Sequence, residues 1–434
     1  MASTMKYTQE IQLISGKIRG LISTLSTGDE VRKYLGIPFA NAKRFELPVL
    51  PIIWSDVKNM TSLGKACMQI QDDISRLDDM SEDCLNLNVF VPHSSTKVPA
   101  LPVMVWIYGD SFQVNSNKLY DGSYIATMGK VIVVAINYRL GAFGFLATGK
   151  DTDLKGNYGM YDQIKALEWV KDNIAGFGGD PKNVTIFGNS AGGVFVSLLC
   201  LSPLADGLFQ NAIMQSGVAN ANWVLSTYNE AVKKTTVLGK NLNCSDIGKL
   251  KSCLDSKTSA EILNALTSVD FEFGSPVIDG TFLLDHPNIL LERGQFQKRN
   301  TLLGVANDDG SSVTDAIPEL SRGLPISSGV NRGEFVSWIS EEAYGLARML
   351  AQTKPPFLKP FGKAMIYRYT NWTHPLKDRL MNRRMFMEVT TDSLYTAPTI
   401  AHANAFAKKN ATTYFYQIEH HVNQGVSRYF KVPS

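Results

Sequence analysis

The sequence predicts an α/β fold with a mostly parallel central sheet, and three observations favour it. Short apolar runs rich in β-branched residues recur along the chain, a helical pattern separates two of them, and one run leads directly into a Gly-rich turn and an apolar helix. The 434 residues are 44% hydrophobic, which is ample for a sizeable core. We therefore expect a globular protein with helices on both faces of the sheet.

The apolar runs define the expected strands. Each is short and bounded by turn residues, which is typical of buried parallel strands. They cover residues 103–107, 131–136, 184–187, 211–215, 301–305 and 413–418.

A helix is expected between the second and third of these strands. Apolar residues recur there at helical spacing, and the Gly- and Pro-rich segment 176–181 ends the pattern. The apolar positions are Ile164, Leu167, Val170 and Ile174.

Ser190 lies where a strand becomes a helix. Its surroundings, Gly188-Asn189-Ser190-Ala191-Gly192, match the Gly-x-Ser-x-Gly frame, in which small neighbours make room for a strained turn. A Gly/Ser turn without chemistry is the alternative, because short patterns of this kind recur by chance. The strand before and the helix after favour a nucleophile elbow, and with it the α/β-hydrolase fold.

Composition excludes some partners. The net charge of +3 is small for this length and no long charged block occurs, so neither nucleic acid nor an anionic membrane surface is indicated. No stretch is long enough to span a membrane, and the first twenty residues lack the apolar core of a signal peptide.

The cysteines indicate an oxidising compartment. The pairs Cys67/Cys84 and Cys244/Cys253 lie in polar, loop-like sequence at separations that close small loops, whereas Cys200 lies in the apolar helix after the elbow. Two disulfides and one buried thiol is the simplest count. Sequons that suit a secreted glycoprotein begin at Asn59, Asn243, Asn371 and Asn410, and a less certain one at Asn183 adjoins a strand. We expect an extracellular protein whose signal peptide is absent from this chain.

Several stretches, in order along almost the whole chain, resemble the type-B carboxylesterase and cholinesterase family. The resemblance implies one α/β-hydrolase domain over residues 1–434, lacking the C-terminal part of the fold, and two N-terminal disulfides of the proposed pairing. It implies ester hydrolysis by a serine, with no cofactor and no metal. The matching stretches are YLGIPFA (34–40), SEDCLNLNVFVP (81–92), NYRLGAFGFL (137–146), residues 156–193, QSGVA (215–219), PVIDG (276–280) and GVANDDGS (304–311).

The family pattern implies an acid at Asp309. Members carry Glu or Asp in an Asn-x-Asp-Glu-Gly-like stretch after a strand, and here residues 301–305 lead into Asn-Asp-Asp-Gly. Asp309 would hold the tautomer of a catalytic histidine and stabilise its cation. For Asp308 a solvated loop acid is the favoured interpretation.

The catalytic base is harder to assign. His374 lies in a polar turn and His402 on an alanine-rich helical pattern, so both suit structural positions. His420 and His421 follow a strand, and chemistry alone would choose this pair. The resemblance instead implies a histidine further on, in a Gly-x-x-His-Gly/Ala-Asp/Glu-like motif, and we expect that the chain as given lacks it.

The oxyanion loop departs from the family pattern. Members carry Gly-Gly-Gly/Ala-Phe, whereas this chain has Gly109-Asp110-Ser111-Phe112. The backbone N–H groups of Asp110, Ser111 and Ala191 are the expected oxyanion donors. If the Asp110 carboxylate points at the site it repels the oxyanion, and if it points away the cost is only steric.

Two further departures narrow the substrate. The segment between Cys67 and Cys84 has no aromatic residue, so it lacks the tryptophan that receives choline in cholinesterases. Asn189 replaces the Glu that usually precedes the nucleophile. An uncharged small-molecule or lipid ester therefore fits better than a cationic one.

Two function classes stay open. One is a serine carboxylic ester hydrolase that works through an acyl-enzyme on Ser190. The other is a non-catalytic, neuroligin-like adhesion protein, which the Asp110 substitution and the missing base favour. The complete elbow and Asp309 favour the enzyme.

Overall fold

The computed structural model describes residues 6–71, 77–93, 99–267, 274–311, 329–350, 358–374 and 376–420. The chain divides into two compact units. The first is formed by Met1–Gln215, Val224–Leu302 and Ala405–Thr413, and the second by Ser216–Trp223, Leu303–Asn404 and Tyr414–Ser434.

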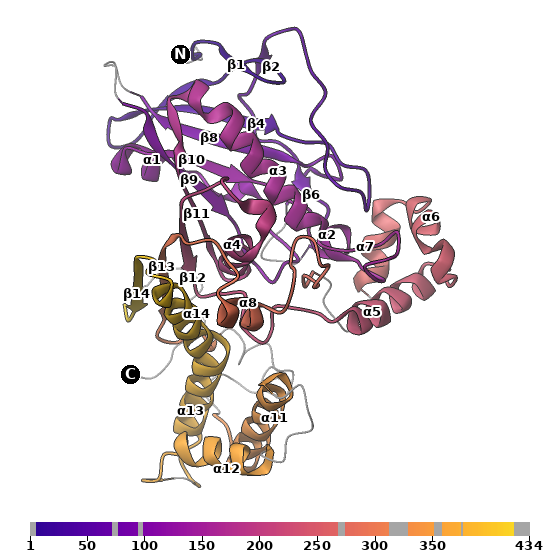
Figure 1. The fold of residues 1–434 in the computed structure, drawn as a ribbon, viewed down its shortest axis with the longest axis vertical. Coiled ribbons are helices and arrows are strands. Elements are labelled where there is room, and N and C mark those ends of the chain that lie inside the picture. Colours follow the sequence, from indigo (N-terminus) through magenta and orange to yellow (C-terminus); the bar gives the residue numbers. More distant parts are fainter. Residues whose placement is uncertain are drawn as a thin grey trace. The chain divides into compact units, whose positions relative to one another are not determined.

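The first unit is built on a twisted mixed sheet (Figure 1). Its strands β12, β11, β9 and β10 pair in parallel, and β8, β4 and β3 continue the sheet in antiparallel pairs. The strand order is β12 (Asn211–Gln215), β11 (Gly179–Asn189), β9 (Leu101–Ile107), β10 (Ile132–Ile136), β8 (Asn86–Pro92), β4 (Glu30–Pro38) and β3 (Leu21–Thr24).

The parallel strands are the ones that the apolar runs predict. All five side chains of β10 are buried, although successive side chains point to opposite faces, so both faces of this strand are covered. On one face Val133 and Ala135 pack with Ala126 of α1 (Ser123–Gly129). The expected α/β architecture is therefore confirmed.

The predicted helix between strands is α3 (Tyr158–Asn173), and it carries a buried ion pair. It continues into a short 3₁₀ turn, Ile174–Phe177, and stops at Gly178, whose φ of +90° suits glycine. Asp162 of α3 is fully buried, and its carboxylate accepts two hydrogen bonds from the Arg139 guanidinium, at 2.8 and 2.7 Å. The pair ties α3 to the segment that follows β10.

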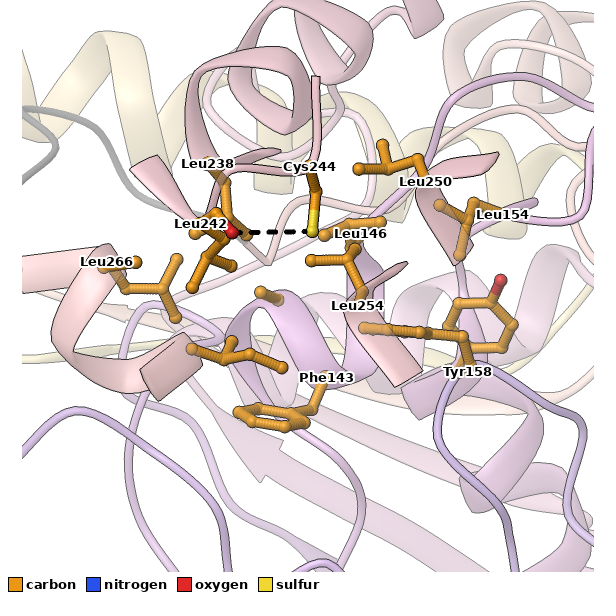
Figure 2. Close-up of a cluster of buried hydrophobic side chains, with 14 residues drawn as sticks. Phe143, Leu146, Leu154, Tyr158, Leu238, Leu242, Cys244, Leu250, Leu254 and Leu266 are labelled. Atoms are coloured by element: carbon orange, nitrogen blue, oxygen red, sulfur yellow. Dashed lines mark hydrogen bonds between the residues drawn. The ribbon is translucent and has the colours of Figure 1, made fainter. Parts of the chain in front are cut away.

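A second apolar core in the first unit joins α5 (Tyr228–Asn241), α6 (Leu250–Asp255) and α7 (Ser259–Thr267) to the segment around α2 (Gly141–Phe145). Figure 2 shows Leu238, Leu254 and Leu266 pointing toward Phe143 and Leu146. Cys244 lies in the same core, and its disulfide to Cys253 links the end of α5 to α6.

Smaller elements complete the first unit. β1 (Ile11–Leu13), β2 (Gly16–Arg19) and β5 (Lys58–Asn59) form a separate sheet, and β6 (Ala66–Cys67) pairs with β7 (Met80–Ser81). The helix α8 (Pro287–Arg293) precedes β13 (Asn300–Ala306), which ends in the second unit.

The second unit is mainly helical. α11 (Arg332–Leu350), α12 (Leu358–Arg368) and α13 (Arg379–Thr391) share an apolar core. A π-helical turn, Asp392–Thr396, follows α13 and leads into α14 (Ala397–Lys408), which ends in the first unit. The core residues are Val330, Phe335, Ile339, Ala343, Met365, Phe386 and Val389.

The last predicted strand forms, but the expectation that it is buried is wrong. β14 (Thr413–Ile418) has β13 as its only sheet neighbour among the described residues, and its residues Tyr414, Phe415 and Ile418 are 64%, 43% and 50% exposed. Tyr414 and Phe415 point to opposite faces, so this edge strand exposes side chains on both faces.

Candidate active site

Ser190 lies at a sharp turn between β11 and α4 (Ala191–Leu201), as the sequence predicts. Its φ of 56° and ψ of −125° are rare for a residue with a side chain, which is typical of the strained serine in a nucleophile elbow. Its N–H donates to the Gln215 carbonyl, 2.8 Å away, and so fixes the turn to the end of β12. The elbow geometry is therefore present.

The glycines of the elbow are required by close backbone approaches. A Cβ on Gly188 would lie 2.5 Å from the Gly192 carbonyl, and one on Gly192 would lie 2.2 Å from the Ile107 carbonyl oxygen. Gly109 approaches from the loop after β9, where a Cβ would lie 2.3 Å from the Asn189 oxygen. The predicted oxyanion loop therefore lies directly against the elbow.

The predicted oxyanion loop holds three consecutive residues with positive φ: 78° at Asp110, 52° at Ser111 and 66° at Phe112. These are conformations that glycine adopts without strain, which is a physical reason for the glycines of the family pattern. Within the described residues, the N–H groups of Ser111 and Ala191 donate no hydrogen bond, so both remain available as donors. Ala191 is the first residue of α4, where the helix dipole favours negative charge.

The Asp110 carboxylate is engaged inside the first unit. Its Oδ2 accepts a hydrogen bond from Asn115 Nδ2, and the same amide nitrogen donates to the Tyr120 hydroxyl at 2.8 Å. The Asp110 carboxylate is thus held by Asn115, whose amide also contacts Tyr120.

Asn189 precedes Ser190 and is exposed. Its Nδ2 donates to the Gln215 carbonyl at 3.3 Å, so the side chain lies along the end of β12. The position that usually carries an anion is neutral.

Asp309 is described within the second unit. Its Oδ2 accepts the Ala306 N–H at 2.8 Å, and the Ser216 side chain also hydrogen-bonds to the carboxyl group. Burial raises the pKa of Asp309, and these two hydrogen bonds oppose that rise. Asp308 contributes a smaller rise through its charge.

Ser216 contacts the candidate acid Asp309 and was not predicted from the sequence. It follows β12 directly, has a φ of 50°, and its N–H donates to the Gly304 carbonyl at 2.8 Å. This fixes Ser216 against β13, which leads into the Asp309 turn. The stretch QSGVA and the position of a serine directly after a strand were the available signals.

The histidines that precede residue 421 take structural or exposed positions. His402 is fully buried on α14, and its Nδ1 lies 3.2 Å from Asn220 Oδ1. Burial lowers its pKa to about 3, so this imidazole is neutral. His374 and His420 are exposed, and His421 lies outside the described residues.

His402 makes stability depend on pH. The folded protein holds this residue at a pKa of about 3, against 6.5 for an ordinary histidine, so only the unfolded chain takes up the proton between these values. From pH 7 to pH 5, His402 should therefore lower the free energy of unfolding by about 2 kcal/mol. Urea unfolding at both pH values measures this loss, which should be absent from the His402→Gln variant. Equal losses in the two proteins would contradict the assignment.

The cysteine expectations fit the structure. Disulfides join Cys67 to Cys84 and Cys244 to Cys253, and Cys200 is a buried free thiol. Burial raises the Cys200 pKa to about 12, which leaves it unreactive at neutral pH. The sequon residues Asn59, Asn243 and Asn410 are exposed, as is Asn183, and Asn371 is half-buried.

A small crevice lies elsewhere in the first unit. It is lined by the first disulfide and by Arg44, Glu82 and Arg139, which belong to two ion pairs, and Ser190 is not among its lining residues. We interpret it as a crevice between structural ion pairs. Across the described residues, no group of three or more His, Cys, Asp or Glu side chains could hold a metal ion. None of the described helices is both long and apolar enough to cross a membrane.

Strand, elbow and helix define an α/β-hydrolase, and comparison with known proteins assigns the family. The Carboxylesterase family matches residues 7–433, so the chain belongs to this family. It is 35% identical to a Mus musculus protein named Cholinesterase, over 95% of this chain and 70% of that protein. It is 34% identical to Mus musculus Neuroligin-2, over 94% of this chain, and 33% identical to Neuroligin-3, over 97%. The chain spans about half the length of these neuroligins, 52% and 55%.

Proposed function

We propose that this protein is a serine carboxylic ester hydrolase that acts on uncharged esters through an acyl-enzyme on Ser190. The observation that carries the proposal is the elbow, which holds Ser190 in a strained turn beside the N–H of Ala191. A residue in such a strained backbone conformation lowers the stability of the fold by about 1–3 kcal/mol. The presence of this strain at Ser190 therefore supports a function for the serine.

In the proposed reaction, Ser190 Oγ attacks the ester carbonyl carbon and a histidine takes the hydroxyl proton. The backbone N–H groups of Asp110, Ser111 and Ala191 stabilise the oxyanion. The histidine returns the proton to the departing alcohol, and water then hydrolyses the acyl-enzyme by the same steps. Asp309 holds the histidine in the required tautomer.

We infer that the base is a histidine of the family motif that follows the matched stretches. His402 does not suit the role, because it is fully buried and its pKa of about 3 makes it too weak a base. Reading the transcript past the Ser434 codon tests this point. A following His-Gly/Ala-Asp/Glu-like motif supports it, and a stop codon at that position contradicts it.

Two features of the sequence support an uncharged substrate. Asn189 has no negative charge that could attract the ammonium group of a choline ester. The stretch between Cys67 and Cys84 has no aromatic ring that could bind this group by a cation–π contact. The proposal is tested with the full-length protein and its Ser190→Ala variant, on a neutral alkyl ester and its choline counterpart. We expect Ser190-dependent hydrolysis with the neutral ester preferred.

A second candidate is a non-catalytic adhesion protein similar to the neuroligins. Asp110 favours it, because a carboxylate in the oxyanion loop works against acyl transfer when it faces the site. The hydrolysis assay separates the candidates, since the adhesion protein would show no turnover that depends on Ser190.

We also infer an extracellular location. Two disulfides indicate an oxidising compartment, and the sequon residues Asn59, Asn243 and Asn410 are exposed. Protein secreted from eukaryotic cells should lose mass when treated with an N-glycan-cleaving amidase. Unchanged mass would show that these sequons are not used.

A further inference from the structure

Asp110 has a dedicated hydrogen-bond donor. Its carboxylate lies in the loop that packs against the elbow, and Asn115 Nδ2 donates to it. The other hydrogen of this amide points to the Tyr120 hydroxyl, 2.8 Å away. Burial raises the pKa of Tyr120, and the charge of Asp110 adds to the rise, which agrees with a carboxylate that faces Tyr120.

Asn115 is itself held rigidly. Its N–H donates to Gln69 Oε1 at 2.7 Å, and its carbonyl accepts from Gln69 Nε2 at 2.9 Å. Its side-chain oxygen accepts the Ser116 N–H at 2.7 Å, which orients Nδ2 toward Asp110. Asn115 is 3% exposed and has a φ of 110°, a conformation that glycine and asparagine tolerate better than other residues.

Gln69 connects this contact to the first disulfide. Its Nε2 also donates to the Cys67 carbonyl at 3.0 Å, and Cys67 is bonded to Cys84. The Asn115 backbone is therefore held by a segment that is distant in the sequence, and its side-chain amide is oriented locally by the Ser116 N–H.

We propose that Asn115 is a positioning residue that holds the Asp110 carboxylate away from the oxyanion donors, so that the loop binds an anion despite its acidic side chain. The inference rests on the proposed ester hydrolysis. A released carboxylate could rotate toward the N–H groups of Ser111 and Ala191, where it would compete with and repel the developing oxyanion.

The test compares kcat and KM for a neutral ester in the full-length protein and three variants. Asn115→Asp places a like charge beside Asp110 and should lower kcat about tenfold or more, with KM little changed, because only the transition state carries the oxyanion. Asn115→Gly, which tolerates the φ of 110°, removes the donor with less risk to folding and should lower kcat in the same direction. The double variant D110N/N115D exchanges the two side chains, restores a donor–acceptor pair and should recover most of kcat.

These measurements distinguish a failure of the proposed ester hydrolysis from a failure of the positioning role of Asn115. If the unmodified protein shows no Ser190-dependent hydrolysis, the proposed function fails and this inference fails with it. If it hydrolyses the ester but kcat is unchanged in Asn115→Gly and Asn115→Asp, only the positioning role is overturned. A loss of kcat that D110N/N115D does not recover would also overturn it, because damage to the fold would not be repaired by exchanging the pair.

Discussion

Replacing Ser190 by alanine should lower kcat/KM for a neutral ester by at least about 10⁴-fold. Alanine removes the only atom that forms the acyl-enzyme and leaves the oxyanion donors in place, so the residual rate reflects binding and the oxyanion loop alone. The substitution keeps a Cβ in the strained turn and removes no backbone hydrogen bond, including that from the Ser190 N–H to the Gln215 carbonyl. The melting temperature should therefore change little.

The matched control is Ser252→Ala, which removes an exposed hydroxyl on α6. This variant should retain the rate of the unmodified protein. Hydrolysis that persists in Ser190→Ala would show that another group performs the reaction and would remove the basis for the enzyme assignment.

Replacing Arg139 by methionine should lower the free energy of unfolding by about 3–5 kcal/mol. The Asp162 carboxylate is fully buried, and this substitution removes both guanidinium hydrogen bonds to it while leaving the Arg139 N–H, which donates to Oδ2 at 3.0 Å. A buried charge without its partner is costly because no water replaces the lost donors. Denaturant unfolding of the two proteins measures the difference.

Two further variants show whether the burial of the Asp162 carboxylate causes the expected loss of stability. Arg293→Met breaks an exposed pair with Asp285, 3.3 Å long, and should cost at most about 1 kcal/mol. Adding Asp162→Leu to Arg139→Met should recover part of the lost stability, since no buried charge then remains. Equal effects of Arg139→Met and Arg293→Met would contradict this account.

The parallel part of the sheet and the elbow could be predicted because their signals are local. Residues 132–136 form an uninterrupted apolar run, and Ser190 lies between a short apolar strand and an apolar helix. The antiparallel strands were harder to detect. In β8 the asparagines Asn86 and Asn88 are buried despite their polarity, and β4 shows no strict alternation of burial. Their polar side chains take part in tertiary hydrogen bonds that no local pattern reveals.

Some features of the candidate site could likewise be predicted from local sequence, whereas others depend on contacts between distant residues. Ser190, Asp309 and the oxyanion loop belong to contiguous motifs, so the sequence could nominate them. The Asp110 carboxylate accepts a hydrogen bond from Asn115, whose backbone N–H donates to Gln69, 46 residues away in the sequence. The contact between Ser216 and Asp309 joins residues that are distant along the chain. Neither contact follows from periodicity or spacing.

Covalent labelling shows directly whether Ser190 is an activated nucleophile. The full-length protein is incubated with an uncharged fluorophosphonate, and the labelled peptide is identified by mass spectrometry. We expect a phosphonyl group on the peptide that contains Ser190, none in Ser190→Ala, and slower labelling in Asn115→Asp. A protein that folds and remains unlabelled at Ser190 would contradict the claim and favour the adhesion function.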